Sequence, residues 1–115
     1  GQCFAEMPDG RRYDYRDVLA VSARFANTLV ALGVNPGDRV AVQVEKSVEA
    51  LMLYLGCVRA GAIFLPLNTA YTANEIGYFL GDAEPRVFVC DPARADELKP
   101  AAEAAGAALE TLGVW

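Results

Sequence analysis

The chain has 115 residues, a formal net charge of −5, and no histidine. This length fits one domain, and the acidic balance disfavours non-specific attraction to nucleic acid or anionic lipid. The lack of histidine excludes His-based nucleophilic triads and most zinc sites, and no apolar run approaches the roughly 18 residues that a membrane span needs.

The amino-terminal part predicts a hairpin followed by a helix. Residues 4–7 and 11–15 are two β-prone runs that flank the turn residues Pro8, Asp9 and Gly10. Asp14 is a plausible N-cap, and Gly33 is a plausible stop signal. Between them the apolar positions recur at helical spacing: Val18, Val21, Phe25, Leu29 and Leu32, with Ser22 on the same face.

A turn at 35–38 leads to a short apolar run at 40–44, which predicts a strand. Ser47 can cap a second helix that ends at Gly61. One apolar stripe of that helix contains Val48, Leu51, Leu55 and Val58.

A second short strand is expected at 62–65. Because proline cannot donate to a central ladder, the strand should stop at Pro66 or lie beside an unpaired position. After the loop at 67–71, Thr72 and Glu75 form a capping-box pattern that opens a third helix. We expect Ile76, Phe79 and Leu80 to form its buried face, and residues 82–85 to end it.

The carboxyl-terminal part predicts a strand at 87–90, a helical stretch and a last strand at 107–112. Asp91 and Pro92 signal the helix start, and Pro100 should restart or kink the helix. Alternation of helices with strands that are apolar on both faces predicts an α/β fold of repeated βα units, in which helices flank a mostly parallel sheet and a β-hairpin precedes it. We place no domain boundary within 1–115.

Phosphate-binding loops of known type are missing from the sequence. It contains neither the G-x-G-x-x-G dinucleotide pattern nor a Walker loop, and its two lysines, Lys46 and Lys99, lie outside any glycine-rich turn. Acidic residues at the helix starts are interpreted as caps, since the helix dipole attracts negative charge there. We therefore predict no catalytic residue and no metal site in this chain.

Two segments resemble core motifs of the adenylate-forming superfamily. Residues 12–18, RYDYRDV, resemble the first motif, roughly L-[TS]-Y-x-E-L, although Asp14 and Asp17 depart from it. Residues 58–68, VRAGAIFLPLN, resemble the second, roughly L-K-A-G-x-x-Y-L-P-L-[DN]. Similar runs are GDRVA at 37–41, YTANEI at 71–76 and DAEP at 82–85, so the resemblance covers essentially the whole chain.

The resemblance implies the amino-terminal part of an AMP-forming acyl-CoA synthetase, an acid–thiol ligase that uses Mg, ATP and CoA. Residues 66–72 and 82–85 look most like malonyl-CoA synthetases, which implies malonate or a similar short acid as substrate. The family's phosphate loop, acyl pocket and catalytic lysine have no counterpart here, so the chain is expected to be an incomplete, inactive unit that needs the remainder of the enzyme. By the same resemblance Leu67, Asn68, Thr69 and Arg94 are candidate CoA contacts.

Two alternatives stay open at this point: an adenylation domain of a peptide synthetase, and a free-standing, non-enzymatic flavodoxin-like binding module. Long apolar stripes and the tail ending at Val114 and Trp115 predict self-association of the isolated piece. The cysteines, Cys3, Cys57 and Cys90, are odd in number and far apart, which favours free thiols in a reducing, cytoplasmic compartment.

Overall fold

The computed structural model describes residues 3–6, 12–45 and 47–111 of the chain. Its strands are β1 (Cys3–Glu6), β2 (Arg12–Asp14), β3 (Arg39–Gln43), β4 (Ile63–Pro66), β5 (Val87–Cys90) and β6 (Ala108–Thr111). Its helices are α1 (Tyr15–Ala31), α2 (Val48–Ala60), α3 (Ala73–Ala83), the 3₁₀ turn η1 (Pro92–Arg94) and α4 (Ala95–Ala104).

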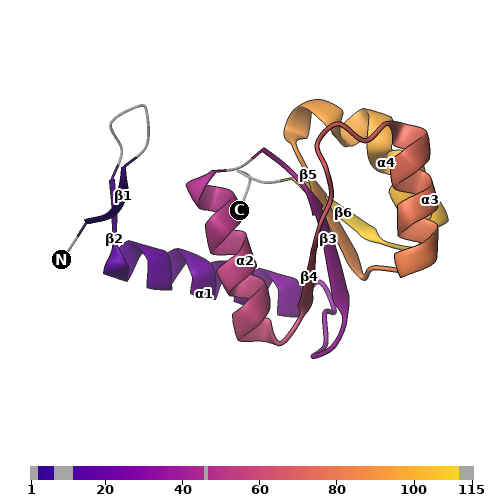
Figure 1. Ribbon diagram of the computed structural model, residues 1–115. Helices are drawn as coiled ribbons and strands as arrows, with labels where there is room; N and C mark the ends of the chain where they lie inside the picture. Colours follow the sequence, from indigo (N-terminus) through magenta and orange to yellow (C-terminus); the bar gives the residue numbers. More distant parts are fainter. Residues whose placement is uncertain (1–2, 7–11, 46, 112–115) are drawn as a thin grey trace.

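The first two strands pair antiparallel, as the predicted hairpin requires. The expected turn at residues 8–10 and the capping side chain of Asp14 lie outside what the structure describes. Helix α1 follows β2 directly, and Gly33 just after it has φ +90°, a left-handed conformation that glycine adopts without strain. The hairpin lies at the end of α1 that points away from the main sheet (Figure 1).

The main sheet has the order β4-β3-β5-β6, and all its strands run parallel. Helices α1 and α2 lie on one side of it, and α3 and α4 lie on the other (Figure 1). Alternate strand residues face the two layers: Val40 and Val42 pack in the core with α1 and α2, whereas Ala41 and Phe88 pack in the core with α3 and α4. The predicted α/β fold with a parallel sheet flanked by helices is confirmed.

The predicted caps of α2 and α3 are formed as well. The Oγ of Ser47 accepts a hydrogen bond from the backbone N–H of Ala50 at 3.0 Å, and Gly61 closes α2 with φ +75°. Thr72 and Glu75 form both bonds of the capping box at the start of α3. The motif stretch around Gly61 is thus a helix stop followed at once by β4.

Three expectations differ from the structure. Helix α4 runs through Pro100 without a break, because losing one hydrogen bond in its second turn is offset by packing of Leu98 and Ala102 in the core. Asp91 makes no side-chain cap bond to the 3₁₀ turn that it precedes. Strand β4 is not covered on both faces: it is an edge strand, and Ile63 is exposed.

Cys57 and Cys90 are buried free thiols. Burial raises the pKa of Cys57 to about 12 and is the main reason that the pKa of Cys90 rises to about 11. No helix in the described part of the chain has the length and apolar character needed to cross a membrane.

Candidate functional site

The topology of the sheet indicates that a ligand-binding site would lie at the carboxyl ends of β3 and β5. From β3 the chain passes through α2 to β4 on one side, and from β5 it passes through α4 to β6 on the other. The crevice between two strands whose connections diverge in this way is where open α/β sheets bind ligands. Gln43 and Cys90 are paired at this end of the two strands, so the residues that follow them line the crevice.

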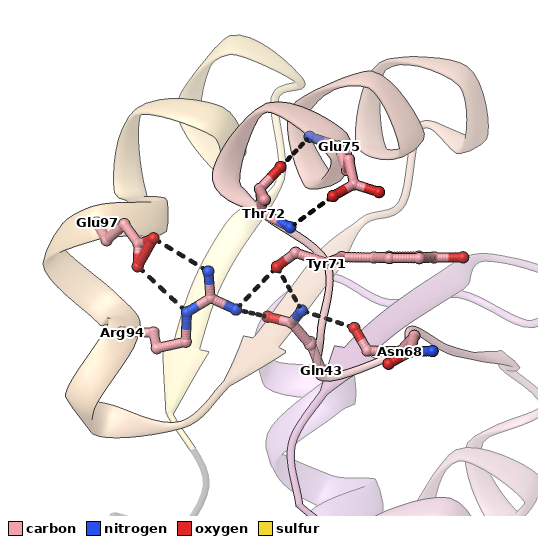
Figure 2. A network of polar contacts seen from close by, with 7 residues as sticks. All are labelled: Gln43, Asn68, Tyr71, Thr72, Glu75, Arg94 and Glu97. Carbon is pink, nitrogen blue, oxygen red and sulfur yellow. Dashed lines mark hydrogen bonds and ion pairs between the residues drawn. The ribbon is translucent and has the colours of Figure 1, made fainter.

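Arg94 lies at this edge, on the turn that follows β5, and its guanidinium faces in two directions (Figure 2). Its Nη1 donates to Gln43 Oε1 at 2.8 Å and to the carbonyl oxygen of Tyr71 at 3.2 Å. Its Nε and Nη2 donate to the two carboxylate oxygens of Glu97 at 3.2 and 3.0 Å. These bonds to Glu97 raise the pKa of Arg94 and lower that of Glu97, since each group stabilises the charged form of the other.

Gln43 connects Arg94 to the loop after β4. Its Oε1 accepts from Arg94, and its Nε2 donates to the carbonyl oxygens of Asn68 at 2.8 Å and Tyr71 at 3.3 Å. The side chain is only 2% exposed, so both ends of the amide are satisfied inside the protein. Sequence reasoning missed this residue, although a polar side chain near the end of the apolar run at 40–44 was a signal that could have marked it.

The three loop candidates have different surroundings. Leu67 is buried in the core under α3 and α4, and its backbone N–H donates to Val42 O at 2.7 Å. Asn68 is exposed, and its Oδ1 accepts from the N–H of Ala70 at 2.8 Å, which folds the loop into a tight turn. Thr69 is exposed.

These three residues line a surface hollow of about 540 Å³. The other lining residues are Val44, Glu45 and Pro66, so the hollow combines an apolar wall with amide, hydroxyl and carboxylate groups. Such a lining suits a neutral chain with amide groups, whereas the exposed carboxylate of Glu45 disfavours a phosphate there. The structure brings Asn68 and Arg94 together through Gln43, while the side chain of Thr69 makes no bond in that network.

Metal ligands and nucleophiles are the next groups to consider at this edge of the sheet. Within the described ranges no three acidic, histidine or cysteine side chains are grouped so as to hold a metal ion. The nearest thiol, Cys90, is buried and has a raised pKa, which makes it a poor nucleophile. The groups that this edge does present are hydrogen-bond donors and acceptors, among them the Arg94 guanidinium and the Asn68 amide.

Comparison with known proteins identifies one family and several relatives. Residues 3–113 match the family described as AMP-binding enzyme. The long-chain-fatty-acid–CoA ligase FadD13 of Mycobacterium tuberculosis is 35% identical over 88 residues, which is 76% of this chain and 18% of that protein. The probable non-canonical nonribosomal peptide synthetase CymA of Salinispora arenicola is 33% identical over 93 residues, which is 80% of this chain and 1% of that protein.

Among solved structures, apo MatB from Rhodopseudomonas palustris superposes with a TM-score of 0.92. It is 51% identical, and the match covers 96% of this chain and 22% of that one. The chain thus spans about a fifth of the length of the first curated relative and of this structural neighbour. The sheet, its helices and the edge described above therefore correspond to one part of a larger known architecture.

Proposed function

Since this chain belongs to the AMP-binding enzyme family, we propose that it forms the amino-terminal part of an ATP-dependent acyl-CoA synthetase, an acid–thiol ligase. The reaction joins a carboxylate to AMP with release of pyrophosphate and then transfers the acyl group to CoA with release of AMP. The observation that carries the proposal is the match over residues 3–113, supported by the superposition on MatB.

We propose malonate or a similar short acid as the acyl substrate. The support is the resemblance of residues 66–72 and 82–85 to malonyl-CoA synthetases. The chain is also less similar to the long-chain-fatty-acid–CoA ligase FadD13, at 35% identity, than to MatB, at 51%.

The proposed CoA contacts are Leu67, Asn68, Thr69 and Arg94, and the geometry supports them unequally. The hollow at Asn68 and Thr69 offers amide and hydroxyl groups beside an apolar wall, which suits the pantetheine arm. Arg94 can hold a phosphate with both Nε and Nη2 only if the phosphate replaces Glu97, because that carboxylate occupies this edge of the guanidinium. The buried side chain of Leu67 offers packing alone.

Residues 1–115 are proposed to be one incomplete unit that is inactive by itself. Mg would need a group of ligating side chains, and the described part of the chain holds no cluster of three or more acidic, histidine or cysteine residues that could bind it. A shallow apolar hollow on α1 and α2 has Leu19, Leu51 and Val58 among its lining residues, and all three are exposed. The remainder of the enzyme is the proposed cover for this face, and self-association is expected when that cover is absent.

We also propose a cytoplasmic, reducing location. Support comes from Cys57 and Cys90, which are buried as free thiols.

The test uses the full-length parent protein with ATP, CoA and a panel of acids. Acyl-CoA formation with malonate, and none by residues 1–115 alone, is the expected result. Turnover by the isolated chain would overturn the view that it is an incomplete unit, and absence of acyl-CoA from every acid would overturn the assigned activity.

A second candidate is a peptide-synthetase adenylation domain, which the 33% identity to the nonribosomal peptide synthetase CymA favours. Pyrophosphate exchange driven by an amino acid, and not by dicarboxylic acids, would establish it. Family membership favours both candidates over the free-standing flavodoxin-like binding module.

The proposed contact at Arg94 has its own test. Arg94→Ala in the parent enzyme should weaken the apparent affinity for CoA, and an unchanged affinity would remove Arg94 from the contacts.

A further inference from the structure

The carboxamide of Gln43 bonds to two segments that are distant in the sequence. It donates to two carbonyl oxygens of the loop after β4, those of Asn68 and Tyr71, and it accepts from Arg94 on the turn after β5. Figure 2 shows Gln43 between Arg94 on one side and Asn68 on the other. A single buried side chain at the end of β3 therefore ties the segments after the two flanking strands together.

The loop at 67–72 depends on few other contacts with the sheet. Its start is held by the bond from Leu67 N–H to Val42 O, and its end is held within α3 by the Thr72 capping box. Between these points Asn68 O accepts from Gln43 and from the N–H of Tyr71 at 3.1 Å. Removing the Gln43 amide leaves the carbonyl of Asn68 with a bond only inside its own loop. Beyond the bond at Leu67, the loop then keeps only the bond from Arg94 Nη1 to Tyr71 O, at 3.2 Å.

We propose that Gln43 is a positioning residue that fixes the 67–72 loop, through Asn68 and Tyr71, in the conformation that binds CoA. This inference rests on the proposed acyl-CoA synthetase activity for its ligand. Gln43 itself is too deeply buried to touch the ligand, so its effect passes through the loop. In the proposed reaction CoA is used only after the adenylate has formed, so the two half-reactions should respond differently.

The kinetic test uses Gln43→Met in the parent enzyme, because methionine keeps the length of the side chain and removes all three bonds. We expect the KM for CoA to rise about tenfold, the effect of losing bonds of ordinary net strength. Pyrophosphate release from acid and ATP, measured with hydroxylamine as acceptor, should stay within about twofold of the unsubstituted enzyme.

Ser22→Ala is the matched control. Ser22 is also 2% exposed, and its Oγ donates to Leu19 O at 3.1 Å within α1, on the other side of the sheet. It should leave the KM for CoA unchanged. A Gln43→Met enzyme that loses both half-reactions in the same proportion, or that keeps its KM for CoA, would overturn the inference.

Hydrogen exchange on residues 1–115 tests the loop without any catalysis. The N–H groups of Leu67, Ala70 and Tyr71 are hydrogen-bonded, and their exchange should become about tenfold faster in Gln43→Met, while exchange in β5 stays unchanged. Gln43→Glu is the second variant: it keeps an acceptor for Arg94, removes the donor to the loop and should speed exchange likewise.

Failure of the proposed activity and failure of the inference about Gln43 give different results. A parent enzyme that makes no acyl-CoA defeats the proposed activity, yet the exchange experiment still decides whether Gln43 holds the loop. Unchanged exchange in both variants would overturn the inference even in an active enzyme.

Discussion

Substitution of Gly56 by alanine tests the close approach of α1 and α2. A Cβ at this position would lie 2.7 Å from Phe25 Cβ, 3.1 Å from Ser22 O and 3.2 Å from Ala26 N. Two of those three atoms belong to the backbone of α1, so no side-chain rotation relieves the overlap and the helix itself must move. Overpacking of this kind costs about 1–3 kcal/mol, and alanine returns about 1 kcal/mol of helix propensity.

We therefore expect Gly56→Ala to lower the free energy of unfolding by up to about 2 kcal/mol, the difference between those two effects. Gly77→Ala is the matched control, because its Cβ would meet only Ala101 Cβ at 3.8 Å, an ordinary contact. That variant should gain about 1 kcal/mol from propensity alone. Urea unfolding followed by circular dichroism, at one protein concentration, measures both. Equal stabilisation by the two substitutions would refute the packing of α1 on α2.

Three further predictions concern single side chains. Thr72→Ala should lower stability by about 1 kcal/mol through loss of the helix cap. The pKa of Glu75 is held low first by the backbone N–H of Thr72 and then by the Thr72 hydroxyl. In Thr72→Ala this pKa should rise partway to its ordinary value in an NMR titration, and an unmoved pKa would contradict the cap. The free energy of unfolding should fall as pH rises above 9, because the unfolded Cys57 thiol ionises there while the folded one ionises only near pH 12. Cys57→Ala should show a shallower fall, and equal slopes in the two proteins would contradict the role of Cys57. Glu97→Gln in the parent enzyme should lower the KM for CoA by freeing Arg94.

The elements could be predicted from sequence because local chemistry determines them. The apolar spacing before Gly33 and the Thr72–Glu75 pair each specify a helix or its end within a few residues, and the structure confirms both. The order of the strands depends on contacts between distant segments. The apolar run at 62–65 does not show that β4 lies at an edge, and only Pro66 at the end of the strand allowed an unpaired position beside it. The predicted interruption of the helix at Pro100 also depended on distant contacts, since core packing of α4 outweighs one lost hydrogen bond.

The candidate site was predictable only in part. Asn68 and Arg94 were identified through resemblance to a family, and the structure joins them through one intermediate residue. That residue, Gln43, lies 25 positions from Asn68 and 51 from Arg94, and no periodicity links such separations. The role of a buried amide at the end of an apolar strand depends on which segments the fold brings next to it.

The two roles proposed for Arg94 are compatible because they use different edges of its guanidinium. Nη1 serves Gln43 and Tyr71, while Nε and Nη2 form a two-pronged pair with Glu97, the same geometry in which arginine grips a phosphate. Glu97 is 52% exposed, and an ion pair at such a surface is weakened by solvent, so a phosphate can replace it without disturbing the Gln43 edge. Glu97→Gln should therefore lower the KM for CoA by about two- to fivefold and leave adenylate formation unchanged. Glu103→Gln, which removes the same charge on the same helix beside Lys99, should change neither. If both variants lower the KM equally, the effect comes from net charge, and Arg94 does not contact the phosphate.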